Sequence, residues 1–141
     1  MSVKIKFKKL REDSQLPKRM TPGAGGFDMY STERKDLTPG NSVVFDSGIA
    51  MAIPEGYVGI ISPRSGLAST KIIKPGARII DSDFRGEVKI NLHNHGKDTL
   101  EICVGDRVAQ LVVVKGLTDW EEVDELDETE RGSGGFGHTG V

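Results

Sequence analysis

The chain has 141 residues with a net charge of −2, and 36% of its residues are hydrophobic. This length suits one domain with its own core, and the balance of charge indicates neither a nucleic-acid partner nor an acidic membrane surface. The first residues, MSVKIKFKKL, alternate apolar side chains with lysines as a strand does. They contain no apolar region of a signal peptide and no membrane-spanning run of about 18 residues. We therefore expect a soluble intracellular protein that acts in the cytoplasm, or inside the host cell if its source is viral.

Turn signals at short intervals divide the chain into apolar segments. In chain order the turns are expected at TPGN (38–41), IPEG (53–56), KPG (74–76), NHGK (94–97) and VGD (104–106). The segments around them are rich in Val and Ile, as strands are: VVFDSGIAMAI, YVGIIS, EVKINLHN, LEICV and RVAQLVVVK. No segment has the pattern of a long helix, and the sequence therefore predicts an all-β sandwich or barrel.

Three of these segments carry more specific expectations. EVKINLHN alternates, so Val88, Ile90 and Leu92 should share one buried face. RVAQLVVVK is apolar on both faces, which is typical of a strand covered on two sides. Cys103, in LEICV, has no second cysteine to pair with, and its apolar neighbours predict a core thiol rather than a nucleophile.

The composition changes after the last apolar segment. Residues 117–130 are strongly acidic, and residues 131–141 include five glycines among eleven positions. We predict a single domain over the whole chain, with a β-barrel core over 1–116, then a C-terminal strand or arm, and then a flexible glycine-rich lid. Glycines allow backbone N–H groups to approach a phosphate, whereas a purely disordered end would not need Arg131 and Phe136.

The segment SPRSGLAST (62–70) follows a predicted strand. Pro63 ends that strand and Ser65 is a good N-cap, so the residues after it could form one helical turn. N–H groups at the start of a helix suit a phosphate, and Arg64 beside them adds a forked cationic donor. A surface turn with an exposed arginine explains this segment at least as well when it is taken alone.

The segment IIDSDFRGEV (79–88) puts two carboxylates directly after a buried strand. Asp81 and Asp83 share a face if the strand continues, and such a pair persists only with a cation, a positive partner or a proton. The pair could hold Mg²⁺, or one carboxylate could orient and deprotonate a water. Phe84 adds a flat apolar surface, and Gly86 lets backbone come close. An Asp-rich β-turn with solvated side chains is the alternative.

The segment GDRVAQLVVV places Gln110 within an otherwise apolar strand. A buried amide needs hydrogen-bond partners. Gln110 therefore serves either the core or a ligand at the edge of the strand.

Five motifs occur in order along the chain. They are AGGFDMYS (24–31), PRSGLA (63–68), GARIIDSDFRG (76–86), GDRVAQL (105–111) and RGSGGFGHTG (131–140). Each is moderately specific alone, whereas all five in this order are very specific. By these motifs the sequence strongly resembles the trimeric, all-β dUTP diphosphatases (dUTPases), and the resemblance spans nearly the whole chain.

The resemblance implies a fold, an assembly and a reaction. The fold is a distorted jelly-roll β-barrel of the β-clip type, in a homotrimer with shared active sites and a flexible C-terminal arm. The reaction hydrolyses dUTP to dUMP and pyrophosphate, which keeps uracil out of DNA and supplies dUMP for dTMP synthesis. Asp81 matches the catalytic aspartate that orients the water attacking the α-phosphorus. Because no Ser or Cys nucleophile arrangement is evident, direct water attack is favoured over a covalent intermediate.

The resemblance also assigns residues to the substrate and to a metal. The residues expected to bind dUTP are Arg64, Ser65, Gly66, Ile79, Ile80, Phe84, Lys89, Gln110, Arg131, Phe136, Gly137, His138 and Thr139. In the lid, Arg131 should reach the phosphates and Phe136 should stack on uracil, with His138 or Thr139 near the terminal phosphate. Mg²⁺ is expected on the triphosphate oxygens, and Asp28 should reach it only through water.

The sequence departs from the family pattern at three places. The aromatic residue of the third motif is Phe84 where Tyr is usual, and either ring would pack on the deoxyribose and exclude a 2′-hydroxyl. Arg78 stands where Gly is usual. The hairpin lacks the Asn that many members use on the uracil edge, with Lys74 and Pro75 in that neighbourhood. Uracil recognition is therefore expected to depend on main-chain groups near Ile79.

Two other functions stay open. dCTP deaminases share this fold and some motifs, but their chemistry needs an acid/base Glu against the cytosine ring. The IDSDF motif and the complete glycine-rich tail favour the diphosphatase. A regulatory protein that uses the dUTP-bound fold to engage another protein is the second alternative, and the intact catalytic set argues against that as the only role.

Overall fold

The computed structural model describes residues 3–62, 64, 73–75, 78–135 and 137. Within these residues all regular secondary structure is strand, so the all-β class predicted from the sequence is confirmed there. No helix in this part of the chain is long and apolar enough to cross a membrane. The strands are β1 (Lys6–Lys9), β2 (Phe27–Tyr30), β3 (Lys35–Leu37), β4 (Ser42–Asp46), β5 (Ile49–Ala52), β6 (Tyr57–Ser62), β7 (Ile73–Pro75), β8 (Ile79–Ile80), β9 (Lys89–Asn94), β10 (Leu100–Ile102) and β11 (Arg107–Lys115).

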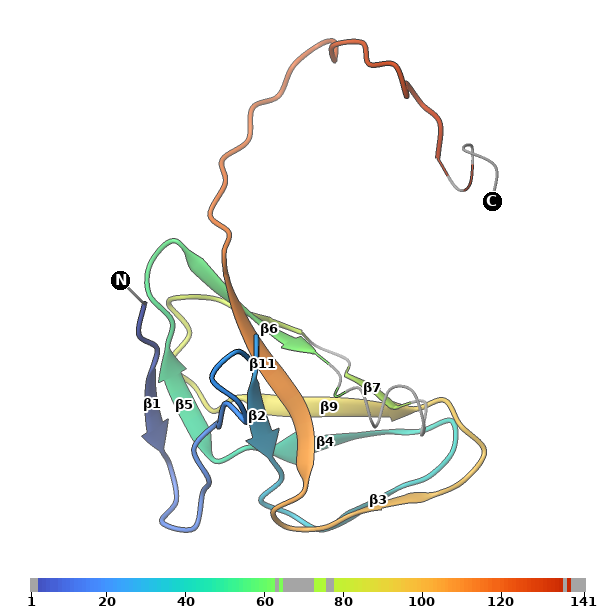
Figure 1. The fold of residues 1–141 in the computed structure, drawn as a ribbon. Helices are drawn as coiled ribbons and strands as arrows, with labels where there is room; N and C mark the ends of the chain where they lie inside the picture. Colours follow the sequence, from blue (N-terminus) through green and yellow to red (C-terminus); the bar gives the residue numbers. More distant parts are fainter. Residues whose placement is uncertain (1–2, 63, 65–72, 76–77, 136, 138–141) are drawn as a thin grey trace.

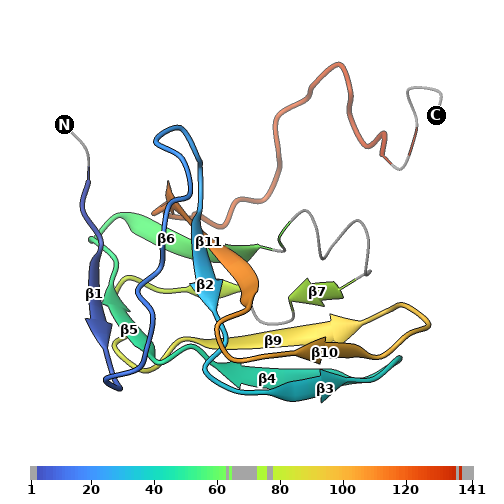
Figure 2. The same ribbon diagram turned by 60° about the horizontal axis from the view of Figure 1, so that its bottom comes forward.

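The strands pair in antiparallel sheets, which Figures 1 and 2 show wrapped around one core. The largest sheet has the order β2-β11-β6-β8, and a three-stranded sheet has the order β4-β9-β7. Two further pairs are β1-β5 and β10-β3. In Figure 2, β2, β11 and β6 lie above β9, β4, β10 and β3. The fold therefore has two layers, and the four-stranded sheet forms most of one of them.

The core fills the space between these layers. Val88, Ile90 and Leu92 are at most 3% exposed, so the single buried face predicted from their alternation is confirmed. They belong to one hydrophobic cluster with Phe45 of β4 and Leu111 of β11. Fully burying one such side chain contributes roughly 1.5–3 kcal/mol. The two layers are held together mainly by this contact.

Strand β11 is buried on one face and partly exposed on the other. Val108, Ala109 and Leu111 are at most 1% exposed. Val112 is half-buried, and Val114 on the same outer face is 37% exposed. The prediction of a strand covered on two sides is therefore wrong for the single chain, because apolar side chains of the outer face reach solvent.

Cys103 lies on the surface, so the prediction of a core thiol is wrong. Strand β10 ends at Ile102, and the chain turns at once, with the N–H of Asp106 donating to the carbonyl of Cys103 at 3.1 Å. The thiol donates to Oε1 of Glu101 at 3.4 Å, and this hydrogen bond to a carboxylate raises the pKa of the thiol. A raised pKa leaves little thiolate at neutral pH, so Cys103 is a poor nucleophile despite its exposure.

The C-terminal arm leaves the barrel where β11 ends, at Lys115 (Figure 1). Residues 117–135 form no strand, and Leu117 and Trp120 are 78% and 84% exposed. Figures 1 and 2 both show the arm extending away from the sheets. The division of the chain into core, arm and lid stays a prediction.

Gly59 occupies the centre of the four-stranded sheet, where it pairs with Ile80 on one side and Val113 on the other. A Cβ at this position would lie 2.5 Å from Cδ1 of Ile53 and 3.2 Å from Cβ of Ile80. Gly59→Ala should therefore lower the free energy of unfolding by about 1–3 kcal/mol, the usual cost of overpacking. Urea unfolding measures this, with Gly23→Ala as the matched control because its added Cβ meets nothing within 4 Å. Equal unfolding free energies in the two variants would contradict this packing.

Candidate active site

Residues of the first and fourth motifs meet at one end of the four-stranded sheet. Asp28 of β2 pairs with Gln110 of β11, and Gln110 pairs in turn with Ser62, the last residue of β6. A Cβ on Gly26 would lie 2.5 Å from Oε1 of Gln110, so this glycine leaves the space that the amide occupies. Asp28, which the motifs assign to the metal, and Gln110, which they assign to the substrate, are thus cross-strand neighbours.

Arg64 comes two residues after Ser62, and its side chain lies against Asp28. Its Nε is 3.7 Å from Oδ1 of Asp28, and its Nη1 donates to the backbone carbonyl of Arg107 at 3.4 Å. The side chain of Asp28 is only 15% exposed, so the guanidinium provides charge where solvent access is limited. Ser65 and Gly66, with the helical turn expected after them, lie outside the described residues.

Arg107 is a residue of this group that the sequence reasoning missed. Its Nη1 lies 3.5 Å from Oδ2 of Asp28, so two guanidinium groups face one carboxylate. Its place in the GDRVAQL motif was the available signal. Simple alternation, however, puts residues three apart on opposite faces of a strand, which separates Arg107 from Gln110. We call Asp28, Arg64, Arg107 and Gln110 the Asp28 cluster.

Asp81 lies near the other end of the sheet, in a turn that follows β8. Ile80 is buried, whereas Asp81 and Asp83 are exposed, and the N–H of Phe84 donates to the carbonyl of Asp81 at 3.2 Å. The strand therefore does not continue through the two carboxylates. The backbone therefore forms the β-turn of the alternative rather than a continued strand, and the exposure of both carboxylates to water weakens their repulsion.

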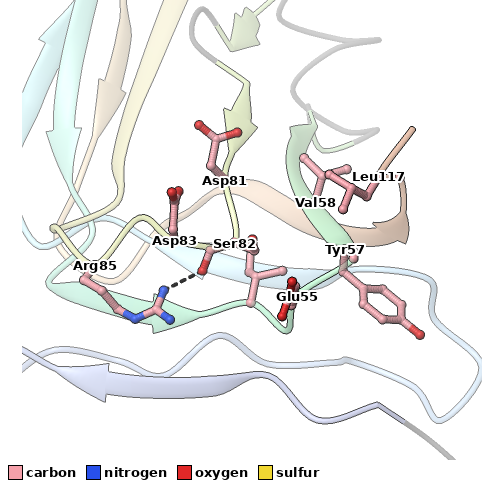
Figure 3. Close-up of a pocket in the computed structure, with 11 residues that line it drawn as sticks. Glu55, Tyr57, Val58, Asp81, Ser82, Asp83, Arg85 and Leu117 are labelled. Atoms are coloured by element: carbon pink, nitrogen blue, oxygen red, sulfur yellow. Dashed lines mark hydrogen bonds between the residues drawn. The ribbon is translucent and has the colours of Figure 1, made fainter. Parts of the chain in front are cut away.

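A cavity of about 670 Å³ lies beside this turn (Figure 3). Its lining includes Asp81 and Asp83 from the turn, Val58 from β6 and Leu117 at the start of the arm. Figure 3 shows Arg85 reaching back to the turn, where its Nη1 donates to the backbone carbonyl of Ser82. This hydrogen bond braces the backbone next to Asp81.

A second cavity, of about 360 Å³, shares Asp81 with the first. Ile79, Ile80 and Phe84 are among its apolar lining residues, and Phe84 is 43% exposed. A Cβ on Gly86 would lie 2.7 Å from Cζ of Phe84, so the glycine leaves room for the ring to lie against the backbone. We call this space the Phe84 cavity. It combines an exposed carboxylate with an accessible aromatic surface.

Two cations, Arg78 and Lys89, also line the Phe84 cavity. Nε of Arg78 donates to the carbonyl of Ile61 at 3.0 Å. Nζ of Lys89 donates to Oδ1 of Asp46 at 2.8 Å, and this hydrogen bond lowers the pKa of Asp46 and raises that of Lys89. Lys89 is thus held by Asp46, which is not part of the cavity lining, whereas Arg78 is held by the carbonyl of Ile61, which itself lines the cavity.

The Asp28 cluster and Asp81 are separated along the four-stranded sheet. Asp81 lies one residue beyond the pairing of β8 with β6, level with Val58, whereas Gln110 pairs with Ser62. The four residues from Val58 to Ser62 span roughly 13 Å, at about 3.3 Å per residue. One chain therefore does not bring the predicted site residues into a single cluster.

Residues 131–135, at the start of the glycine-rich end, lie away from the sheets (Figure 1). Nε of Arg131 donates at 2.7 Å to the carbonyl three residues further along the same tail. Gly137 has a φ of 89°, a conformation that glycine adopts without strain. The lid residues Phe136, His138 and Thr139 lie outside the described residues. The predicted contacts of the lid with a substrate therefore stay predictions.

The donor groups of the described residues do not form a metal cage. In the part of the chain that the structure describes, no three His, Cys, Asp or Glu side chains are grouped so that they could hold a metal ion. Asp28 has guanidinium groups at both of its oxygens. This arrangement fits a cation that arrives with most of its oxygen ligands already in place, as Mg²⁺ does when phosphates and water coordinate it.

The family is decided by comparison with protein-family models. Residues 12–140 match the family described as dUTPase. The chain belongs to the dUTPase family. The resemblance inferred from the five motifs is thereby confirmed, and the two residue groups described above belong to a dUTPase.

Curated dUTPases of distant organisms are similar to this chain over nearly its whole length. The deoxyuridine 5'-triphosphate nucleotidohydrolase of Yarrowia lipolytica is 41% identical over 144 residues, covering 100% of this chain and 90% of that protein. The protein of the same name from Mus musculus is 42% identical, covering 96% and 85%. That of Syntrophotalea carbinolica is 44% identical, covering 99% and 98%.

Solved dUTPase structures share the fold. The Staphylococcus bacteriophage 80alpha dUTPase with dUPNHPP has a TM-score of 0.91 at 28% identity, covering 99% of this chain and 100% of that one. A variant dUTPase from phage phi11 of S. aureus, described as revealing the coordination of a structural Mg(II) ion, has a TM-score of 0.81 at 27% identity, covering 87% and 98%. The jelly-roll-like dUTPase fold expected from the motifs is confirmed.

Proposed function

We propose that this protein hydrolyses dUTP to dUMP and pyrophosphate by attack of water on the α-phosphorus. The observation that carries the proposal is the Phe84 cavity, where the carboxylate of Asp81 lies beside an exposed ring and an apolar wall. The relatives named above, all deoxyuridine triphosphate nucleotidohydrolases, support the same reaction. In a cell the reaction would keep uracil out of DNA and supply dUMP for dTMP synthesis.

Asp81 is assigned to the attacking water. It lines both cavities beside its turn, which leaves space for a water molecule next to a bound nucleotide. An ionised carboxylate orients such a water and accepts its proton as the new bond to phosphorus forms. The bond from the α-phosphorus to the bridging oxygen breaks, and pyrophosphate leaves. The hydrogen bond from Arg85 to the carbonyl of Ser82 keeps the turn in place for this step.

The Phe84 cavity is assigned to the nucleoside. The exposed ring of Phe84 packs on the deoxyribose and leaves no room for a 2′-hydroxyl, which would lose hydrogen bonds to water against an apolar surface. Main-chain groups of Ile79 and Ile80 read the uracil edge. Lys89, at the rim, faces the substrate with a charge that its ion pair with Asp46 preserves.

The Asp28 cluster is assigned to the triphosphate. Hydrolysis of a phosphoanhydride depends mainly on charge neutralisation and an in-line water. Arg64, with Ser65 and Gly66 after it, and Gln110 supply the donors on the phosphate side. Mg²⁺ bound to the triphosphate would neutralise further charge on its oxygens. Asp28 would reach that metal through water, since both of its own oxygens face arginines.

A homotrimer with shared sites would join the separated residue groups. Asp81 and the Asp28 cluster lie apart on one chain, and each supplies only part of the assigned chemistry. The outer face of β11, where Val112 and Val114 are partly exposed, offers apolar surface to a second copy. In such an assembly one copy adds its Asp28 cluster to the Phe84 cavity of a neighbour.

The glycine-rich tail is assigned the role of a lid over this shared site. Arg131 contacts the phosphates, Phe136 stacks on uracil, Gly137 lets the backbone approach, and His138 or Thr139 reaches the terminal phosphate. Stacking of an aromatic ring on a base contributes roughly 1–3 kcal/mol, part of which offsets the entropy of ordering the tail. Closure excludes water and aligns the triphosphate, so its benefit belongs to turnover.

The proposed setting is the cytoplasm, or the interior of a host cell if the source is viral, with no nucleic-acid or membrane partner. Its dUTPase relatives include proteins named as mitochondrial, among them one from Homo sapiens. The substrate and the other copies of the chain are the proposed partners.

Turnover of dUTP, dTTP, dCTP and UTP, each with and without Mg²⁺, tests this function. Preferred hydrolysis of dUTP to equal amounts of dUMP and pyrophosphate, stimulated by Mg²⁺, is the expected result, because the Phe84 cavity selects the sugar and the metal neutralises phosphate charge. Formation of dUTP from dCTP would instead reveal a deaminase. Tight binding of dUTP without any turnover would reveal a binding protein.

Asp81→Asn keeps the size of the side chain but removes the base and the charge. Turnover should fall by about 10²-fold or more, the scale of general-base catalysis, while dUTP binding stays within about tenfold because the other contacts remain. Rates of pyrophosphate release and calorimetric binding of dUPNHPP measure the two effects. Asp83→Asn is the matched control and should be much milder. The reverse ranking would show that Asp83 holds the water.

A chain that ends at Glu130 should keep its thermal midpoint and the mass of a trimer but lose most of its activity. The reason is that the lid acts on the bound nucleotide, whereas the core residues that hold the fold lie before the arm. Light scattering, thermal unfolding and dUTP turnover measure the three properties. Hydrolysis as fast as in the full chain would refute the lid, and a fully active monomer would refute the shared site.

A further inference from the structure

A β-bulge in β11 determines which way Arg107 points. Gln110 pairs with Asp28 and Ala109 with Met29, but the next pair on β2, at Tyr30, is made by Arg107. Residue 108 is therefore the extra residue of the bulge. Paired residues share a face and side chains alternate along a strand. In an unbroken ladder Arg107 would lie on the face opposite to Asp28, and the bulge brings it to the same face.

The burial of residues along β11 agrees with this reversal of the side-chain alternation. Val108 and Ala109 are adjacent in sequence and both at most 1% exposed, which a regular alternating strand with one solvent-facing side does not produce. Arg107, before them, has a side chain that is 41% exposed. Bulges commonly re-aim a side chain next to a functional site.

Arg107 makes two contacts within the Asp28 cluster. Its Nη1 lies 3.5 Å from Oδ2 of Asp28, and its backbone carbonyl accepts a hydrogen bond from Nη1 of Arg64 at 3.4 Å. Nε of Arg64 lies 3.7 Å from the other oxygen of Asp28. One carboxylate thus lies between two guanidinium groups. The three side chains together carry a net positive charge, which suits a polyphosphate.

We propose that Arg107 is a positioning residue of this enzyme: it holds Asp28 so that Arg64 remains available to the phosphates of the substrate. The inference rests on the proposed function. With Arg107 in place, Asp28 divides its charge between two partners, and Arg64 can turn to an arriving triphosphate while Asp28 keeps a counter-ion. Without it, the partly buried Asp28 draws Arg64 into a closer ion pair, and the triphosphate must break that pair in order to bind.

If the ion pair of Arg107 with Asp28 only stabilised the fold, a different result would be expected. A partly exposed ion pair contributes only about 0–1 kcal/mol to stability, so its loss would move the thermal midpoint slightly and leave the affinity for substrate as it was. A positioning role lowers affinity for the triphosphate through Asp28 and leaves the chemical step almost unchanged. KM and kcat therefore separate the two roles.

The test compares Arg107→Gln and Arg107→Lys with the natural chain, using dUTP turnover at saturating Mg²⁺ and calorimetric binding of dUPNHPP. Arg107→Gln should raise KM and the dissociation constant about tenfold, with kcat within about threefold, the pattern of a lost binding contact. Arg107→Lys keeps the charge and should recover most of the affinity. Arg34→Gln is the matched control, since Arg34 also pairs with two carboxylates, Asp36 at 3.3 Å and Glu101 at 2.9 Å, away from the cluster. It should change nothing.

Arg107→Gln in an Asp28→Asn background decides whether Arg107 acts through Asp28. The tenfold effect should shrink to less than about twofold there, because the carboxylate that would capture Arg64 is gone. Unchanged binding of dUPNHPP by Arg107→Gln, or an equal effect in both backgrounds, would overturn the inference. If Arg107→Gln does not fold, Arg107→Met, which keeps the aliphatic stem and removes the charge, gives the same decision in both backgrounds. A natural chain that neither binds dUPNHPP nor hydrolyses dUTP would instead overturn the proposed function itself.

Discussion

The antiparallel pairing of β6 on both of its edges is the constraint on which the rest of the site depends. Its ladder with β11 brings Gln110 level with Ser62, and the chain then continues directly to Arg64. Its short ladder with β8 ends just before Asp81. Because one strand carries both ladders, its length sets the distance between the phosphate-side residues and the proposed catalytic carboxylate. The proposal of an active site shared between copies of the chain follows from that distance.

Glycines at close approaches leave the space that two side chains of the site, Gln110 and Phe84, occupy. A side chain on Gly26 would occupy the space of the Gln110 amide, and one on Gly86 would meet the ring of Phe84. Gly59 allows β6 to lie against the core where β8 and β11 pair with it. In each case a neighbouring side chain occupies the space that a Cβ would fill, so the glycine is needed for packing rather than for a turn. Substitution at these positions would therefore move a functional side chain as well as reduce packing.

Arg64, Arg107 and Lys89 are paired with carboxylates before any substrate arrives. Asp28 separates the guanidinium groups of Arg64 and Arg107, which would otherwise repel each other at close range. Asp46 likewise holds Lys89 at the rim of the Phe84 cavity. The free chain thus keeps cations near both parts of the site without an unpaired buried charge. An arriving triphosphate would exchange carboxylate partners for phosphate partners, which makes affinity sensitive to how tightly the carboxylates hold those cations.

By itself the sequence determined the all-β class, the buried face of β9 with Ile90, and the family, because alternation and motif order are properties of short stretches of chain. The tertiary structure alone decided that Asp81 stands in a turn, that Cys103 lies on the surface, and that Arg107 faces Asp28. Sequence reasoning left the turn at Asp81 open and placed Cys103 wrongly in the core. Both residues follow the end of a strand, and where a strand ends depends on whether a neighbouring strand still pairs with it. Sequence reasoning missed the orientation of Arg107 because one bulged residue reverses the side-chain phase of a strand. Only the hydrogen-bonding partner strand determines where such a residue falls.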